Sequence, residues 1–304
     1  MRTLKKNWMR ICRRKWLYIL MIPGIIYYVI YRYLPMAGLT IAFQNYQPFL
    51  GIGRSTFVGL DHFIRIFSVP WFEKIFTNTL IFAVLNLVFY FPIPILLAIM
   101  INEVKNNALK RSVQTMIYVP HFVSWVVVVS IGYTFFTTEN GVFNNLIVAL
   151  GGTEQPFLVS NEWFRWVTLI EIVWKEAGWG TIIFLSALTA VDKQLYESAA
   201  IDGANRFQKI VHITIPAIQG TIITMLLLRI GRFMDTGYEQ IYLMLNALNR
   251  DAGEVFDTYV YTTGIVQGQY SFSAAIGMFK SMIGLILLVG ANIAVKKAGK
   301  DGLY

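Results

Sequence analysis

Residues 196–216 read YESAAIDGANRFQKIVHITIP, a polar and charged stretch in a chain that is 56% hydrophobic. Asp192, just upstream, is suited to begin a helix as an N-cap or first-turn acid. Gly203 permits a sharp turn, and Pro216 is tolerated in the first turn of a following helix, where no amide donor is needed. The stretch therefore predicts a helix over 197–204 with a glycine elbow, a second short helix over 206–213, and then a long helix.

The rest of the chain favours a lipid bilayer as its surroundings. Its 304 residues have a mean hydropathy of +0.55 and are only 14% charged, whereas a soluble domain has about 25% charged residues. A membrane helix needs about 20 apolar residues, and runs this long and continuous do not suit barrel strands. The predicted class is an all-α, polytopic membrane protein with six transmembrane helices: 16–33, 79–101, 118–136, 166–188, 217–233 and 272–295.

Lysine and arginine predict the orientation. Sixteen of them fall in the N-terminal tail, the loops 102–117 and 189–216, and the C-terminal tail, against five in the alternate loops. By the positive-inside rule both termini are expected in the cytoplasm. The run 16–33 is long and aromatic and has no small-residue cleavage site, so we interpret it as a retained helix rather than a signal peptide. The net charge of +9 is then a topology signal and does not indicate nucleic-acid binding.

The predicted organisation follows from these spans. It comprises a basic cytoplasmic tail (1–15), a first transmembrane helix with an outer segment (16–78), a core with five further helices (79–295) and a second cytoplasmic tail (296–304). The single cysteine, Cys12, lies in the first tail, so no disulfide can form within the chain.

Motifs for catalysis and for metal binding are absent from the sequence. His62, His121 and His212 are far apart, with no HExxH spacing and no cysteine partner, so no metal site is predicted. There is no GxxxxGK[ST] loop to hold ATP phosphates and no GxSxG elbow. We expect no catalytic residue and no cofactor in this chain.

The loop 189–216 is placed on the cytoplasmic side by the predicted topology. It carries apolar side chains that no lipid can cover there: Ala199, Ala200, Ile201, Phe207 and Ile210. Either a docking partner buries them or the loop folds back onto its own bundle.

The same loop resembles the EAA signature of ABC importer permeases. That signature reads Glu-Ala-Ala, three residues, Gly, nine residues, Ile-x-Leu-Pro, and this chain has Glu197-Ser198-Ala199, Gly203, Ile213 and Ile215-Pro216. Ser198 and Ile215 are mild departures from it. The stretches YVPHFVSW (118–125), GVFNNLI (141–147) and FSAAIGMFKSMIG (272–284) are similar to oligosaccharide permeases, particularly LplB-type polysaccharide importer subunits.

The resemblance implies a type I ABC importer permease fold in a bacterial cytoplasmic membrane. Glu197 would pair with a basic residue of a separate ATPase, Gly203 would form the elbow, and Ser198, Ala199, Asp202, Ile213 and Pro216 would complete the coupling segment. The implied partners are a second similar permease, two ATPase copies that bind ATP and Mg, and an extracytoplasmic sugar-binding protein. Closure of the ATPases would rock the bundle between inward-open and outward-open states.

Charged residues inside the predicted helices indicate a substrate pathway, because such residues usually face a cavity or each other. Lys175, Arg229 and Lys280 lie about 20 Å from the cytoplasmic helix ends, at 1.5 Å per residue. In the resembled family the sugar contacts fall at about this depth on the helices flanking the coupling loop. Arginine suits carboxylates, so the expected substrate is an acidic, uronate-containing oligosaccharide. The predicted pathway residues are Lys175, Glu176, Trp179, Arg229, Arg232, Phe233, Thr236 and Lys280.

Other interpretations stay open from the sequence. The charges could instead pair between helices, as Glu171 with Lys175, Glu176 with Arg229, and Asp235 with Arg232. The outer loop 234–271 could reach toward the binding protein or be merely solvated, and the segment 34–78 has no assigned role. A self-sufficient secondary transporter of a small solute is the alternative function, although the chain shows no repeat with broken helices.

Overall fold

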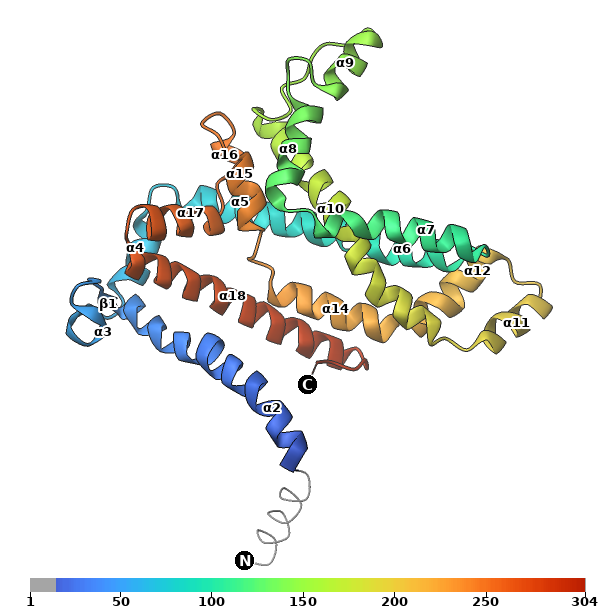
Figure 1. Cartoon of the computed structure of the whole chain (residues 1–304), viewed down its shortest axis with the longest axis horizontal. Helices are drawn as coiled ribbons and strands as arrows, with labels where there is room; N and C mark the ends of the chain where they lie inside the picture. The colour runs from blue at the N-terminus through green and yellow to red at the C-terminus, as the bar shows by residue number, and fades with distance from the viewer. Residues whose placement is uncertain (1–14, 304) are drawn as a thin grey trace, which may run out of the picture. The chain divides into compact units, whose positions relative to one another are not determined.

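The structure is a computed structural model that describes residues 15–303, so Cys12 and nearly all of the predicted N-terminal tail lie outside the described residues. The described chain is overwhelmingly helical (Figure 1), with a single two-stranded sheet between 15 and 303. It divides into two compact units, one built from residues up to Ser68 with Thr263–Met278 and the other from Val69–Thr262 with Phe279 onward.

The first unit begins with a long apolar helical stretch. It consists of α2 (Lys15–Tyr28), the π-helical turn η1 (Val29–Tyr33) and the 3-10 helix η2 (Leu34–Phe43). This stretch extends ten residues beyond the predicted span 16–33. Its side chains are exposed throughout α2, as expected of a helix with lipid or another chain around it.

The outer segment, which has no role assigned from the sequence, forms short helices and strands. It contains β1 (Gln44–Asn45), α3 (Gly51–Arg54), β2 (Thr56–Phe57) and α4 (Asp61–Ser68), and β1 pairs antiparallel with β2. The Tyr46 amide donates to Ser271 Oγ at 2.9 Å, and Arg65 donates to the Gln269 side chain at 2.9 Å. These bonds fix the segment to the residues that begin α18 (Tyr270–Lys297) within the same unit.

The second unit is a helical bundle around α10 (Asn161–Thr189). In Figure 1, α10 runs beside α6 (Pro92–Asn102) and α7 (Asn107–Tyr118), and many of their residues are in contact. The other elements are α5 (Phe72–Leu85), η3 (Asn86–Tyr90), η4 (Val119–Phe122), α8 (Trp125–Phe136), α9 (Val142–Ala149), α11 (Lys193–Ile201), α12 (Arg206–Lys209), η5 (Ile210–Thr214), α13 (Ile215–Ala217), α14 (Gln219–Gly231), α15 (Tyr238–Met244), α16 (Arg250–Gly253) and α17 (Phe256–Tyr261), with η6 (Thr262–Val266) leading back to the first unit.

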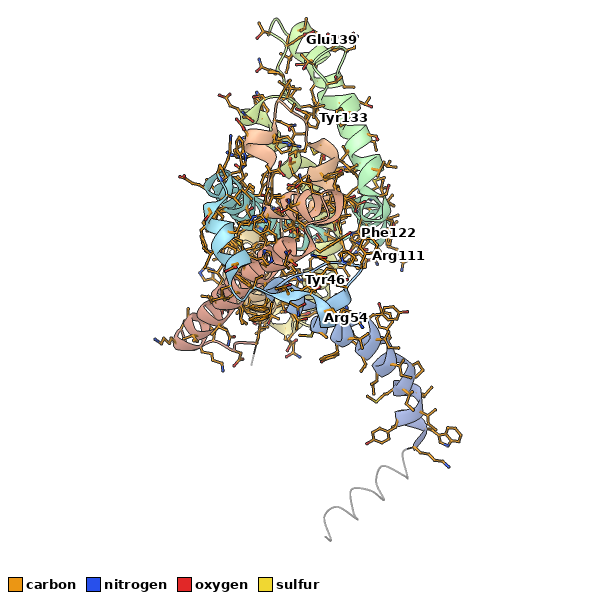
Figure 2. The ribbon with its side chains drawn as sticks, turned by 90° about the vertical axis from the view of Figure 1, so that its left-hand side faces the viewer. Tyr46, Arg54, Arg111, Phe122, Tyr133 and Glu139 are labelled. Atoms are coloured by element: carbon orange, nitrogen blue, oxygen red, sulfur yellow. The ribbon has the colours of Figure 1, made fainter. Side chains whose placement is uncertain are left out.

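The stretch 118–136, predicted as one transmembrane helix, is interrupted and is not a single helix. The chain bends by 104° between the helical stretch Asn107–Phe122 and α8. Figure 2 shows Phe122 before the bend, Tyr133 within α8 and Glu139 beyond its end. Pro120 cannot continue an α-helical hydrogen-bond ladder, and Ser124 Oγ accepts from the Val127 amide to start α8 afresh.

Three helices are long and apolar enough to cross a membrane, and two bent pairs pass the same test if each is one span. The single helices are Lys15–Phe43, Phe72–Asn102 and Tyr270–Lys297. α10 has 29 residues but carries Glu171, Lys175 and Glu176 in its middle, so its composition is less apolar than theirs. A polytopic α-helical membrane fold is therefore confirmed, while the count of six spans stays a prediction.

Two apolar clusters hold α10 at its two ends. Near its start, Phe164 and Val167 pack with Phe82, Ile241 and Val255. Near its end, a second cluster joins α10 to α6 and to the start of α14: Ala98, Ile99, Ile101, Phe184, Leu185, Leu188 and Ile218. Because Ile241 and Val255 are fully buried, the part of the outer loop that belongs to this unit, residues 234–262, is not a merely solvated loop.

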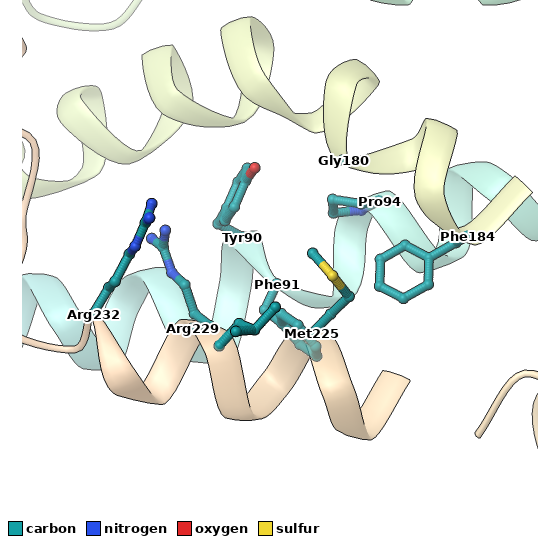
Figure 3. A pocket seen from close by; sticks show the side chains of 9 residues that line it. Tyr90, Phe91, Pro94, Gly180, Phe184, Met225, Arg229 and Arg232 are labelled. Atoms are coloured by element: carbon teal, nitrogen blue, oxygen red, sulfur yellow. The ribbon is translucent and has the colours of Figure 1, made fainter. Parts of the chain in front are cut away.

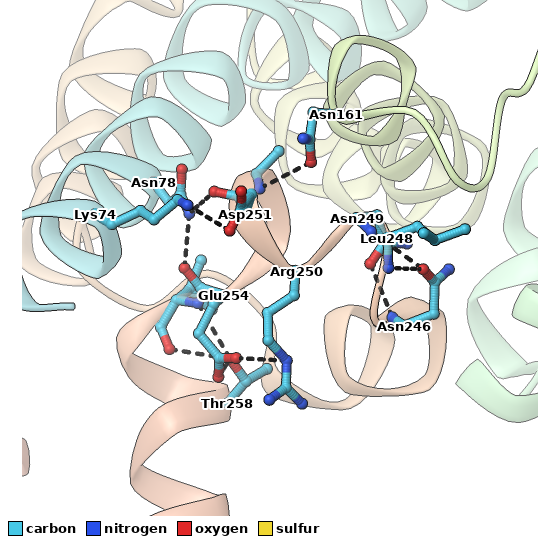
Figure 4. Close-up of polar contacts among 12 residues, drawn as sticks. Lys74, Asn78, Asn161, Asn246, Leu248, Asn249, Arg250, Asp251, Glu254 and Thr258 are labelled. Carbon is cyan, nitrogen blue, oxygen red and sulfur yellow. Dashed lines mark hydrogen bonds and ion pairs between the residues drawn. The ribbon is translucent and has the colours of Figure 1, made fainter.

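Polar contacts fix this outer region to α5 and α10 (Figure 4). Asn78 donates to the carbonyl oxygens of Asp251 and Glu254, both at 3.0 Å, and Lys74 forms an ion pair with Asp251. Burial raises the pKa of the Glu254 carboxyl, while the Arg250 charge and a hydrogen bond from Thr258 oppose the rise. The region is thus a packed helical cap on the bundle of the second unit.

The crossing of α7 over α10 depends on Gly178. A Cβ at this position would overlap the carbonyl group of Ile117. We expect Gly178→Ala to destabilise the protein by about 1–3 kcal/mol, since neither backbone can move without disturbing the packing around it. Thermal unfolding of the detergent-purified protein measures the loss. Gly290→Ala is the control, because a Cβ there meets nothing within 4 Å, and equal stability of the two variants would contradict the prediction.

Candidate coupling loop and translocation pathway

The coupling segment is a helix, a glycine elbow and a second helix, as the sequence predicts. Asp192 Oδ1 accepts from the Gln194 amide at 2.9 Å and caps α11, which ends at Ile201. Gly203 follows with a φ of +80°, the left-handed region that favours glycine. Asn205 and Gln208 then form a reciprocal capping box that begins α12, with bonds of 2.8 and 2.9 Å.

The second helix is longer than predicted. It runs from Arg206 through the π-helical turn η5 to Ala217, and it is bent by 62° relative to α14. Pro216 therefore lies in the last part of this helix, in α13, and not in the first turn of the membrane helix. The Tyr196 hydroxyl lies 3.0 Å from Thr214 Oγ1 and connects α11 to η5.

The apolar side chains of this segment are exposed rather than folded back. Ile201 is 87% exposed and Phe207 is 73% exposed. Glu197 is exposed too and has no ion pair among residues 15–303. A hollow of about 410 Å³ lies between the two helices, lined by Ala199, Asp202, Gly203, Ala204, Gln208, Lys209, His212 and Ile213. The segment consequently has the apolar surface, the free carboxylate and the concavity that a docking partner could cover.

The elbow provides a direct test of this geometry. Nothing lies within 4 Å of a Cβ built on Gly203, so Gly203→Ala adds only backbone strain of about 1–2 kcal/mol. We expect ATP hydrolysis stimulated by the loaded binding protein to fall by about fivefold or more in the reconstituted complex, since 1.4 kcal/mol is tenfold. Gly220→Ala is the matched control, because its Cβ is equally unobstructed and its φ is not positive. Equal ATP hydrolysis in both variants would show that coupling does not require the left-handed conformation at Gly203.

A cavity of about 310 Å³ lies between α6, α10 and α14. Figure 3 shows Arg229 of α14 and Arg232, the residue just after that helix, on the same side of the cavity as Tyr90, with Met225 and Phe184 on the other side. The remaining lining residues are Phe91, Pro94, Gly180 and Leu228. The Arg229 guanidinium carbon lies 5.3 Å from the centre of the Tyr90 ring. A smaller hollow beside it brings in Phe233 and Asp235 with the same two arginines.

The charge pairs considered from the sequence do not form. Gln240, and not Lys175, donates to Glu171 Oε2, at 2.8 Å. Glu176 is bound by its neighbour Lys175 and not by Arg229, and Asp235 lies 3.3 Å from Lys280 and forms no ion pair with Arg232. Within residues 15–303, Arg229 and Arg232 have no carboxylate at ion-pair distance. Two guanidinium groups are thus left facing a cavity.

Of the other predicted pathway residues, Lys175, Glu176 and Trp179 lie together on α10. Lys175 Nζ lies 3.1 Å from Glu176 Oε1 and is buried. Trp179 is half exposed and stacks against His121. Tyr90 connects this group to the cavity, because its hydroxyl donates to the carbonyl oxygen of Glu176 at 3.4 Å.

Lys280 and Thr236 belong to a different group. Lys280 bonds to Asp257 and also faces Asp235. The other Asp257 oxygen accepts from the Thr236 amide at 2.9 Å and from its hydroxyl at 3.1 Å. Both Lys280 and Thr236 are buried, so the structure places them at the junction of α14, α17 and α18 and outside the arginine cavity.

Two residues of the site had no role predicted from the sequence. Tyr90 contacts Arg229 across the cavity, and His121 contacts both Glu176 and Trp179. His121 lies within the YVPHFVSW stretch, where Pro120 is a signal for a break. Nothing in the apolar run around Tyr90 distinguishes it from a packing aromatic.

Comparisons with known proteins agree with this geometry. Residues 90–298 match the family model described as "Binding-protein-dependent transport system inner membrane component". The chain is 50% identical over 300 residues to the Bacillus subtilis "Polygalacturonan/rhamnogalacturonan transport system permease protein YteP", covering 99% of this chain and 94% of that protein. It is 52% identical over 299 residues to "Protein LplB" of the same organism, covering 98% and 94%.

Solved structures are similar over nearly the whole chain. One is described as a bacterial ABC transporter involved in the import of the acidic polysaccharide alginate, with 37% identity and a TM-score of 0.87, covering 96% of this chain and 99% of that one. Another is the alginate transporter in complex with an alginate pentasaccharide-bound periplasmic protein, with 37% identity, a TM-score of 0.88 and coverage of 97% and 99%.

Proposed function

The chain belongs to the family of binding-protein-dependent transport system inner membrane components, and from this membership we propose that it carries an acidic oligosaccharide across the cytoplasmic membrane. It is a transporter subunit and not an enzyme. Family membership sets aside the alternative of a self-sufficient secondary transporter. Its partners in this proposal are a second permease, two copies of an ATPase that bind ATP and Mg, and an extracytoplasmic binding protein, with both termini in the cytoplasm.

The observation that carries the substrate class is the pair of arginines in the cavity. A neutral sugar would leave the guanidinium groups of Arg229 and Arg232 uncompensated, and burying an unpaired charge is costly. A uronate carboxylate would compensate them, and the planar guanidinium can bind it through two hydrogen bonds. Relatives named for polygalacturonan and for alginate, both acidic, support the same class of substrate.

The remaining features of the cavity also suit a sugar. Tyr90 and Phe91 provide aromatic rings that can pack against the C–H face of a pyranose, and the Tyr90 hydroxyl provides a polar group. Gly180 also lines the cavity and, having no side chain, takes up none of its space. Apolar walls with a few oriented polar groups are the usual composition of a small-molecule site.

Uptake by the reconstituted complex tests the proposal. The chain, its partner permease, the ATPases and the binding protein are assembled in proteoliposomes with ATP on the ATPase side. A labelled oligogalacturonate is compared with the same oligosaccharide after reduction of its carboxylates to alcohols, which keeps its length and ring chemistry. We expect ATP-dependent uptake of the acidic chain to exceed that of the reduced chain by about tenfold or more, since one charge-assisted contact is worth about 1.5–3 kcal/mol. Equal uptake would contradict an acidic specificity.

A further inference from the structure

His121 lies where the bend between α7 and α8 meets the middle of α10. Its Nδ1 donates to Glu176 Oε2 at 2.7 Å. The face of its ring stacks on Trp179, with a centroid separation of 4.4 Å and an interplanar angle of 6°. Phe122 stands edge-on to both rings. One side chain therefore contacts a carboxylate with its edge and an exposed aromatic ring with its face.

Lys175 completes the group from the opposite side. Its Nζ donates to the carbonyl oxygen of His121 at 2.7 Å and lies 3.1 Å from Glu176 Oε1. Both carboxylate oxygens of Glu176 are therefore engaged, one by an ammonium group and one by an imidazole N–H. Lys175 is also 5.2 Å from the Trp125 ring centre, which packs it between α8 and α10.

From these contacts we propose that His121 is a specificity residue, which together with Lys175 occupies both oxygens of the Glu176 carboxylate so that an anionic sugar chain can pass the Trp179 ring. This inference rests on the proposed function, since it concerns how the pathway accepts a negative substrate. Glu176 is partly exposed beside Trp179, and a free carboxylate there would repel a uronate in surroundings of low dielectric. With its oxygens occupied, α10 offers the substrate an aromatic face and no net negative charge.

Two roles of the His121 ring can be separated by substitution. His121→Phe keeps a flat ring that can stack on Trp179 but removes the donor to Glu176. His121→Asn keeps an amide donor but removes the stacking ring. Glu176→Gln removes the negative charge of the carboxylate that His121 contacts. The three changes thus distinguish charge compensation from support of Trp179.

The experiment measures uptake of the oligogalacturonate and of its carboxyl-reduced form by complexes that carry each variant. In His121→Phe we expect acidic uptake to fall by about tenfold, the loss of one charge-assisted hydrogen bond, while uptake of the reduced form changes by less than about twofold. Adding Glu176→Gln to His121→Phe should restore acidic uptake to within about threefold of the wild type, because the carboxylate that has lost its imidazole donor is then replaced by a neutral amide. If His121→Phe does not assemble, His121→Asn tests the inference instead. Its ratio of acidic uptake to uptake of the reduced form should equal that of the wild type.

Three results would overturn the inference. They are normal acidic uptake in His121→Phe, an equal loss for both substrates that Glu176→Gln does not rescue, and an altered ratio in His121→Asn. Uptake by the wild type is a separate measurement that decides the proposed function. A wild-type complex that carried only the reduced chain would overturn both, whereas selective wild-type uptake with an unaffected His121→Phe variant would overturn the His121 inference alone.

Discussion

Replacing Arg229 by glutamine is expected to lower uptake of an oligogalacturonate by at least about thirtyfold, because truncating a charged contact that the ligand desolvates costs about 2–5 kcal/mol. Arg229 lines the 310 Å³ cavity and packs over Tyr90, and among residues 15–303 no acid forms an ion pair with it. Glutamine keeps a hydrogen-bonding group, on a shorter side chain, but removes the charge. Uptake of the carboxyl-reduced chain should change much less.

The same substitution at Arg232 is expected to act in the same direction. The Arg232 side chain lines the same cavity but is more exposed than that of Arg229. The loss of acidic uptake in Arg232→Gln should therefore be smaller. Arg250→Gln is the matched control, since Arg250 lies on the helical cap and is largely exposed, with only an i,i+4 pair to Glu254. Every variant is assayed with the same binding protein, so the selectivity of that protein does not contribute to differences between the variants. Normal acidic uptake by both cavity variants would mean that the arginines do not contact the substrate.

The coupling segment was predictable because its signals are local. A cap at Asp192, a glycine at 203 and a proline at 216 each restrict the backbone in a known way, and the structure has α11, a left-handed Gly203 and a second helix in this order. The prediction was wrong about the bounds of the first helix, which is α11 (Lys193–Ile201) and not 197–204, and about where the second helix ends. That depends on the π-helical turn η5 and on the 62° bend before α14, which no short-range pattern specifies.

The break inside 118–136 was missed because hydropathy alone was used to place that span. The run is continuously apolar, and hydropathy does not distinguish a straight helix from a bent one. Pro120 and Ser124, a helix breaker and an N-cap, were the available signals. They would have predicted a helix that restarts near Trp125.

The partners of the intramembrane charges could not be predicted from spacing. An i+4 relation suggested Glu171 with Lys175, yet Glu171 bonds to Gln240, which is 69 residues away in the sequence. His121 reaches Glu176 from 55 residues away, through the bend that was not predicted. Which charge meets which is decided by helix packing, so the pairing of the charges could not be predicted from the sequence.

Charge reversal at Glu197 is expected to uncouple the transporter while leaving the chain in the membrane. Glu197 lies on α11 in the matched signature, is exposed and has no ion pair within the described part of the chain, so its replacement perturbs no internal contact. The family resemblance implies a basic residue of the ATPase opposite Glu197, and Glu197→Lys would then put two like charges together at that interface. Removing one partner of such a pair costs about 2–5 kcal/mol, so we expect sugar-stimulated ATP hydrolysis to fall by at least about thirtyfold.

The matched control for this prediction is Glu103→Lys. Glu103 is also exposed, lies just after α6 in another loop predicted to face the cytoplasm, and undergoes the same change of charge. Because a cation is favourable at the C-terminal end of a helix, this variant should assemble and hydrolyse ATP normally. Assembly of both variants is checked by co-purification of the partner permease, and ATP hydrolysis is measured with and without the loaded binding protein. If Glu197→Lys is stimulated as strongly as Glu103→Lys, the carboxylate does not contact a basic group of the ATPase, and the exposed apolar residues Ile201 and Phe207 must dock the segment without it.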